Sequence, residues 1–187
     1  DVRKKITDKT RAIMAVHLYG HPCNMTELVA IAKDNKIYLV EDCAESIGSK
    51  YNNQMTGTFG DISSFSFFGN KTITTGEGGM VLTNNPVLHE KSVHLKGQGL
   101  AKNREYWHDI VGYNYRMTNI CAAIGLAQLE NVNDVIKIKR EIAAWYNDEL
   151  KGLPIEPQME ESKAFNTYWM YSILTKTNQE RDKLRAF

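Results

Sequence analysis

The stretch that decides the fold of this chain is Asp61–Gly79, with the sequence DISSFSFFGNKTITTGEGG. It contains a β-prone run that ends in Phe67 and Phe68, then a single lysine, Lys71, and then a glycine-rich turn. Lysine side chains normally stay in water, so a lysine between an apolar strand and such a turn is either desolvated for chemistry or extends from the strand end into solvent. The rest of the sequence has to decide between these two interpretations.

The composition is that of a soluble globular protein, with 42% hydrophobic and 24% charged residues among 187. This length allows one domain with a substantial core, or one domain and part of another. Lys and Arg total 23 against 22 for Asp and Glu, so the net charge of +1 produces no large electrostatic field. We therefore expect neither nucleic acid nor an anionic membrane surface as a partner.

The sequence also predicts a cytoplasmic location. No apolar run approaches the roughly 20 residues that span a bilayer, and the first residues, DVRKKITDKTR, are charged where a signal peptide would be apolar. Three cysteines, Cys23, Cys43 and Cys121, are widely spaced and odd in number, which is typical of a reducing compartment. His17, His21 and Cys23 suggest zinc, but a second half-site is missing, and we expect no metal.

The first part of the chain is typical of a strand–helix–strand unit. The apolar run Ala12–Leu18 predicts a buried strand, Asn24 is a candidate N-cap for the next helix, and Ile37–Val40 predicts a second strand. Ligands of such units gather beyond the carboxyl ends of the strands, which is where Asp42 falls. Asp42 is therefore a candidate functional acid, with the alternative that it caps a helix that begins near Ala44.

The remaining elements follow from apolar periodicity and from breakers. Two more strands, Ile62–Phe68 and Gly79–Thr83, flank Lys71 like a hairpin. Further predicted elements are a helix from Pro86 to Leu95, helix from the Thr118 cap to Leu150 with a possible break at Asn131–Asp134, a strand over Tyr168–Leu174, and a helix at the carboxyl end. The polar loop before Thr118 interleaves aromatic and basic residues, which favours closure over a small anionic ligand. Gly152 and Pro154 predict a domain boundary, with residues 1–151 before it and 152–187 after it.

Four blocks of the sequence, taken together, resemble the DegT/DnrJ family of sugar aminotransferases. They are AVHLYGHP, VEDCAESIGS, SFSFFGNKTITTGEGG and GYNYRMTNICAAIGLAQL, in the family's order and spacing. The resemblance implies an aspartate-aminotransferase-like α/β fold (fold type I): a large α/β/α domain around a mainly parallel sheet, then a small α+β carboxyl-terminal domain. It also implies pyridoxal phosphate (PLP) as cofactor and a homodimer with shared active sites. Family members are longer chains whose opening segment binds the phosphate, so the resemblance marks this chain as an excerpt.

The resemblance assigns roles to five residues. Lys71 matches the lysine that forms the internal Schiff base with PLP, and desolvation would favour its nucleophilic form. Asp42 matches the carboxylate that keeps the pyridine nitrogen protonated. Ser66 matches a hydroxyl that binds the phosphate, and Asn114 matches an amide that reaches the phosphate of the neighbouring subunit; the alternatives are an ordinary strand serine and turn asparagine. Glu45 stands near the ring oxygen where many members carry glutamine, so it either shares a proton there or makes a different contact.

Within the family, the residues around Lys71 are similar to those of enzymes that aminate C4 of nucleotide-linked 4-keto-6-deoxy sugars, such as perosamine synthases. We therefore expect glutamate and a nucleotide sugar as substrates. A PLP-dependent sugar dehydratase is an alternative, but those relatives carry histidine in place of the lysine. A catalytically silent piece that only assembles with a partner is a second alternative.

Overall fold

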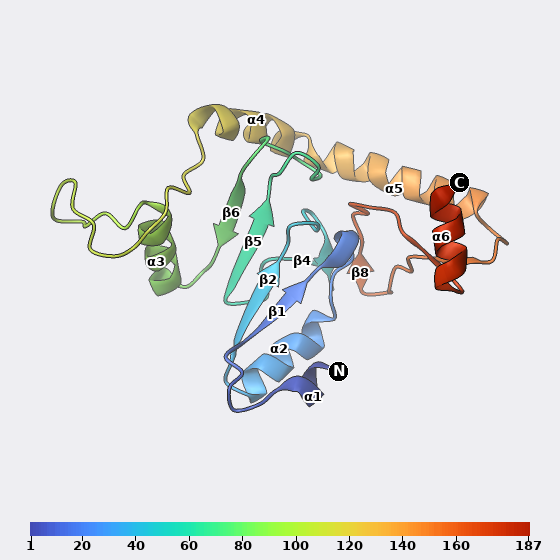
Figure 1. Cartoon of the computed structure of the whole chain (residues 1–187), viewed down its shortest axis with the longest axis horizontal. Helices are drawn as coiled ribbons and strands as arrows, with labels where there is room; N and C mark the ends of the chain where they lie inside the picture. The colour runs from blue at the N-terminus through green and yellow to red at the C-terminus, as the bar shows by residue number, and fades with distance from the viewer.

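A four-stranded sheet forms the centre of the computed structural model, which describes residues 1–187 (Figure 1). Its strand order is β1-β2-β5-β6, with β1 (Ala12–Val16), β2 (Tyr38–Asp42), β5 (Ile62–Ser66) and β6 (Gly79–Leu82). The first three strands are parallel, and β6 runs antiparallel to β5. The predicted mainly parallel sheet and the hairpin around Lys71 are thus confirmed.

The six helices are α1 (Val2–Lys5), α2 (Met25–Asp34), α3 (Pro86–Lys96), α4 (Asn119–Glu130), α5 (Val132–Glu149) and α6 (Asn178–Ala186). Four of them, α2, α3, α4 and α6, begin at a residue whose side chain caps the first turn. The side chains of Asn24 and Thr118 accept hydrogen bonds from backbone N–H groups in the first turns of α2 and α4, as predicted. The expected break separates α4 from α5 at Asn131. None of the helices is both long and apolar enough to cross a membrane.

The core lies between α2 and one face of the sheet. Alternate residues of β1 point toward it, because successive side chains of a strand face opposite sides, and Ile13 and Ala15 are buried there. The other members of this cluster are Met25, Ile31, Ala32, Leu39 and Tyr51. On the opposite face Met14 remains 65% exposed, so this side of the sheet has no cover.

Two small sheets surround the central one. One has the order β4-β3-β8 and consists of β3 (Lys50–Tyr51), β4 (Gln54–Met55) and β8 (Ala164–Phe165). The other pairs β7 (Ile155–Pro157) with β9 (Ile173–Thr175). Because β8 pairs with β3, the chain beyond Gly152 returns to the central part. The boundary near Gly152 stays a prediction.

The predicted strand over Tyr168–Leu174 is wrong for most of its length. Only its last residues belong to a strand, β9, and Tyr168 has a positive φ of 48° that no strand accommodates. The reason lies just before it: Asn166 and Thr167 are fully buried, and the backbone N–H of Tyr168 donates to the side chain of Asn166 at 2.8 Å. The segment is therefore a buried turn, held by contacts with Gly20 and Ser49.

Helices α4 and α5 follow one another along the side of the molecule toward which β5 points (Figure 1). Between α3 and α4 the chain forms an arm, residues 97–117, that projects away from the sheet on the side opposite α5 (Figure 1). Two isolated bridges, Gly97 to Asn114 and Leu100 to His108, hold its strands together.

Candidate active site

Three of the predicted site residues lie at one edge of the sheet. The strands β2 and β5 are parallel neighbours that pair Asp42 with Ser64, so both end on the same side. Ser66 is the last residue of β5, and Lys71 follows in the loop to β6. Ligand sites in α/β proteins form at such carboxyl ends because the loops there are free to vary.

The loop that carries Lys71 is fixed at both ends. The backbone N–H of Thr75 donates to the carbonyl of Phe67 at 2.9 Å. Gln128, from α4, binds the backbone of Thr74 twice: its Oε1 accepts from the N–H at 3.0 Å and its Nε2 donates to the carbonyl at 2.6 Å. The glycine-rich turn is thus pinned to a helix, which places Lys71 on a rigid loop.

The structure excludes one of the two interpretations of Lys71, that of a side chain that extends into solvent. Its side chain is only 14% exposed, so it does not extend into solvent. Its surroundings are nevertheless not purely apolar, because Nζ lies 3.9 Å from Oε1 of Glu45 and 4.1 Å from the ring centroid of Trp169. The expected apolar setting is corrected in this respect: the amine lies between a carboxylate and an indole face.

Glu45 makes two contacts, both through its carboxylate. Oε2 accepts a hydrogen bond from the backbone N–H of Tyr19 at 2.7 Å, and Oε1 faces the amine of Lys71. A carboxylate next to an amine gains from the opposite charge. The predicted position of Glu45 near the ring oxygen of PLP stays a prediction.

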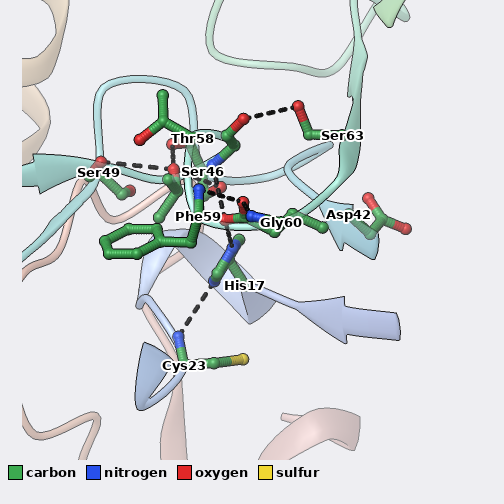
Figure 2. A network of polar contacts seen from close by, with 12 residues as sticks. His17, Cys23, Asp42, Ser46, Ser49, Thr58, Phe59, Gly60 and Ser63 are labelled. Atoms are coloured by element: carbon green, nitrogen blue, oxygen red, sulfur yellow. Dashed lines mark hydrogen bonds and ion pairs between the residues drawn. The ribbon is translucent and has the colours of Figure 1, made fainter. Parts of the chain in front are cut away.

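Asp42 does not cap a helix. Its Oδ1 accepts a hydrogen bond from the backbone N–H of Ala44 at 3.0 Å, but the chain after it forms turns, so the contact is an Asx turn. The helix considered near Ala44 is absent because Cys43, Ser46 and Ser49 are buried in a polar network that holds an irregular backbone. Figure 2 shows the Asp42 side chain pointing away from that network.

The network is centred on the side chain of Glu41, the residue before Asp42. Figure 2 labels three residues that bind it, His17, Phe59 and Gly60. Its Oε2 accepts from Nε2 of His17 at 3.1 Å and from the N–H of Gly57 at 2.7 Å, and its Oε1 accepts from the N–H groups of Phe59 and Gly60 at 2.7 Å each. Burial raises the pKa of Glu41, but the hydrogen bonds from His17 and from the three N–H groups outweigh it, so the pKa is lowered. The carboxylate is therefore held in its charged form without any solvent contact.

His17, Glu41 and Cys43 bring three potential metal ligands within 4.8 Å of one another. The Nδ1 of His17 accepts from the backbone N–H of Cys23 at 3.1 Å, so the ring proton is on Nε2 and points at Glu41. Burial, together with the carboxylate of Glu41, raises the pKa of the Cys43 thiol to about 12. The Cys43 thiol is thus held protonated, and the ligand atoms of His17 and Glu41 are already engaged in hydrogen bonds, so this cluster is a structural network. His21 points elsewhere and bonds to Pro22 and Glu161.

Ser66 and Asn114 differ in their relation to Lys71. Ser66 lies on the edge that carries Lys71, and its Oγ accepts from the N–H of Phe68 at 3.3 Å. Asn114 lies in the exposed arm, where its Oδ1 accepts from Nε of Arg116 at 3.5 Å. Asn114 pairs with Gly97 at the base of the arm, and the side chains of Asn114 and of Lys71 in the same chain make no contact with each other.

Sequence reasoning missed three residues of this site: Tyr19, Gln128 and Trp169. The first and the second lie inside quoted blocks, AVHLYGHP and GLAQL, which were used for their fold and not for their contacts. Trp169 lies in the predicted strand Tyr168–Leu174, and no local pattern signals its contacts with residues 70 and 71.

Known proteins resemble this chain along its whole length. The model of the DegT/DnrJ/EryC1/StrS aminotransferase family matches residues 1–187. The chain belongs to this family. The GDP-perosamine synthase of Escherichia coli O157:H7 is 60% identical over 185 residues, which are 99% of this chain and 50% of that relative.

Solved structures share the fold. DesV of S. venezuelae, in complex with a ketimine intermediate, superposes with a TM-score of 0.90 at 32% identity over 99% of this chain and 50% of its own. The E. coli GDP-4-keto-6-deoxy-D-mannose-3-dehydratase with bound hydrated PLP gives a TM-score of 0.89 at 28% identity, over 99% and 52%. The predicted family and fold class are confirmed. The chain spans about half the length of these proteins.

Proposed function

We propose that the whole protein is an aminotransferase that uses PLP to move an amino group from glutamate to a nucleotide-linked 4-keto-6-deoxy sugar, as a GDP-perosamine synthase does. The observation that carries this proposal is the amine of Lys71. Its side chain is 14% exposed and its Nζ makes no hydrogen bond, yet it lies at the carboxyl end of a parallel sheet. The 60% identity to a relative named GDP-perosamine synthase supports the choice of substrate.

The side chains at this edge fit PLP by their chemistry. Lys71, Asp42 and Ser66 offer an amine, a carboxylate and a hydroxyl, which match an aldehyde, a pyridine nitrogen and a phosphate. Thr72, next to Lys71, has a buried Oγ1 without a hydrogen-bond partner, so the site also contains a hydroxyl that can bind a ligand. We infer that Lys71, Asp42 and Ser66 hold the cofactor, with Glu45 beside them.

When bound, PLP supplies an electron sink for the carbon that loses a proton. The carboxylate of Asp42 would hold the proton on the pyridine nitrogen, because the negative charge stabilises the protonated form. The Nζ of Lys71 would take the proton from the substrate carbon that carries the amino group. Asn114, which lies in the arm, would bind the phosphate in a second copy of the chain, so we propose a homodimer.

A sugar dehydratase on the same fold is the nearest rival, given the 28% identity to the E. coli dehydratase. The resemblance described above implies histidine at the lysine position of such enzymes. The residue here is Lys71. We therefore favour transamination.

The test supplies the whole protein with PLP, glutamate and GDP-4-keto-6-deoxy-D-mannose. An aminotransferase forms 2-oxoglutarate and a 4-amino sugar in equal amounts, and Lys71→Ala abolishes both products while the far-ultraviolet circular dichroism stays unchanged. A 3-deoxy sugar in place of the 4-amino sugar would instead identify a dehydratase. A folded protein without any visible absorbance from bound PLP would indicate a catalytically silent piece.

A further inference from the structure

The side chain of Trp169 contacts the Lys71 loop in two ways. Its indole Nε1 donates a hydrogen bond to the carbonyl oxygen of Asn70 at 2.9 Å. Its ring faces the amine of Lys71, with 4.1 Å between Nζ and the ring centroid. One side chain therefore fixes both the backbone before the lysine and the charged end of the lysine.

Tyr19 connects this tryptophan with the carboxylate on the other side of the amine. Its ring stacks on Trp169, with 6.2 Å between the ring centroids and 28° between the planes. Its backbone N–H donates to Oε2 of Glu45, whose Oε1 lies 3.9 Å from Nζ of Lys71. The four side chains thus form a closed ring of contacts, which we call the lysine clamp: Tyr19, Glu45, Lys71 and Trp169.

The backbone at Tyr19 is strained, and this strain supports the contacts of the lysine clamp. Tyr19 has a φ of 58°, in the left-handed region that is unfavourable for a bulky residue. Such conformations persist only when the surroundings fix them, and they gather at functional sites. Here the strain turns the N–H of Tyr19 toward Glu45 while its ring remains against Trp169.

Trp169 is held in place by its backbone as well as by its ring. The preceding Asn166 and Thr167 are fully buried, and the hydroxyl groups of Thr167 and Ser49 lie 2.8 Å apart. Gly20 allows this close approach, since a Cβ there would lie 2.9 Å from the backbone nitrogen of Trp169. The position of the indole is therefore set before any cofactor binds.

We propose that Trp169 is a positioning residue for Lys71, which holds the free amine beside Glu45 whenever the amine is not bonded to another group. This role rests on the proposed function, in which the amine of Lys71 is released from PLP during the reaction and must later return to the same position. The physical basis is the attraction between an ammonium and the face of an indole, the strongest of the aromatic partners. The indole face also covers the amine, whose side chain is only 14% exposed, and so makes it less reactive toward acylating reagents.

The test measures the reactivity of Lys71 in PLP-free whole protein. A trace of acetic anhydride labels the amines, and peptide mass spectrometry gives the labelling of Lys71 relative to Lys183, which is exposed on α6. In Trp169→Leu the relative labelling of Lys71 rises by about two- to fivefold, the size of one cation–π contact. The matched control, Trp145→Leu, removes a tryptophan that is 64% exposed on α5 and leaves the labelling unchanged.

A third variant distinguishes the effect of an aromatic face at position 169 from the effect of packing alone. Trp169→Phe keeps an aromatic face and loses the N–H that binds Asn70, so the labelling stays within about twofold of wild type. Equal labelling in Trp169→Phe and Trp169→Leu would show that the ring does not hold the amine and would overturn the proposal. So would unchanged labelling in Trp169→Leu.

A parallel arm distinguishes this proposal from the proposed function. Wild-type protein is incubated with PLP, reduced with borohydride and mapped for a phosphopyridoxyl group. A label on Lys71 supports the proposed function. A wild-type protein with no such label would overturn that function, while the acetylation result, obtained without PLP, would still decide the role of Trp169.

Discussion

At the scale of single residues, Glu41 and Asp42 are neighbours in β2 with opposite environments. Side chains alternate along a strand, and Glu41 points into the protein, where it is buried. The side chain of Asp42 points to the other side (Figure 2). Glu41 has no solvent exposure and accepts four hydrogen bonds, whereas Asp42 accepts one, from Ala44. The carboxylate of Glu41 therefore stabilises the fold, whereas the carboxylate of Asp42 is available to bind a ligand.

The first prediction concerns the stability that Glu41 provides. In Glu41→Gln an amide NH₂ replaces one of the two acceptor oxygens and faces backbone N–H groups, so buried donors lose their partner. We expect a loss of about 3 kcal/mol in the free energy of unfolding. Urea denaturation at pH 7 measures this, with Glu149→Gln, exposed at the end of α5, as the control that changes stability little. A loss equal to that of the control would contradict the role of Glu41.

The lowered pKa of Glu41 also predicts a pH dependence. A carboxylate with a lowered pKa in the folded state adds stability above its unfolded value, near 4.5, and this contribution disappears as the pH falls through the folded value. The melting temperature of the wild type should therefore fall more steeply below about pH 4.5 than that of Glu41→Gln. Parallel curves for the two proteins would show that Glu41 is not charged in the folded state.

The next prediction concerns Asp42 and depends on the proposed function. In Asp42→Asn an amide cannot hold the pyridine nitrogen protonated, so the electron sink weakens. We expect kcat to fall on the order of 10²-fold or more, while PLP still attaches to Lys71. Steady-state kinetics and borohydride mapping check the two parts. Near-normal turnover would show that Asp42 has no role in catalysis and only forms the Asx turn with Ala44.

The sequence located part of this site but not its contacts. Asp42, Ser66 and Lys71 could be placed at one sheet edge because strand periodicity and the family blocks both locate strand ends. The partner of Glu45 could not be predicted, since it depends on a positive φ at Tyr19 that no local pattern signals. Trp169 was missed because it reaches Lys71 across almost a hundred residues of sequence.

At the scale of elements, the turn at Gly20 and the returning segment, residues 166–169, depend on each other. Gly20 has a φ of 98°, and a Cβ there would lie 2.8 Å from the nitrogen of Tyr168, closer than real Cβ contacts. The N–H of Thr167 donates to the carbonyl of Gly20 at 3.3 Å. The turn after β1 is therefore shaped to receive a segment from the other end of the chain.

This dependence gives a prediction with a built-in control. Gly20→Ala adds both a backbone penalty and an overlap with backbone atoms, so we expect a loss of about 2 kcal/mol or more in unfolding free energy. Gly152→Ala has a similar φ of 84° but nothing within 4 Å of the new Cβ, so it should cost only about 1 kcal/mol. Urea denaturation of both variants gives the comparison. Equal losses of unfolding free energy in the two variants would mean that residues 166–169 move away from the added Cβ at position 20 without cost.

The elements with a regular period were predictable, and those made by long-range contacts were not. The four central strands and the capped helices have local apolar patterns in the sequence, so their predicted bounds differ from the observed ones only at the ends. The strands β3, β4 and β8 have two residues each and exist because distant segments meet, which no local pattern reveals. The apolar run at Tyr168 was read as a strand because burial alone does not distinguish a strand from a buried turn.

At the scale of the whole molecule, large apolar side chains remain in contact with solvent. All four residues of β6 are exposed, and no residue of α4 is buried, with Ile120 75% exposed. In the arm, Val111 is 84% and Tyr115 72% exposed. Exposed apolar surface of this extent is typical of a face that packs against another part of a protein or against another chain. The arm therefore has the composition of a segment that packs against another chain, with stacked aromatic rings as interfaces often have.

The last prediction concerns assembly, and it follows from the position of Asn114 in that arm. If the arm enters the active site of a second copy, each site combines Lys71 from one chain with Asn114 from the other. We would mix the whole protein carrying Asn114→Ala with the whole protein carrying Lys71→Ala, under conditions that allow subunits to exchange. One site of each mixed dimer would then be intact, and the activity should rise above that of either parent protein.

The control for this experiment is a mixture that cannot form an intact site under either arrangement. Lys71→Ala mixed with a protein carrying both Lys71→Ala and Asn114→Ala should stay inactive, since no chain supplies the amine. If Asn114 served the site of its own chain, every Lys71 in the first mixture would remain beside a damaged residue at position 114. Mixing would then restore nothing, and the arm would have to fold back onto its own subunit.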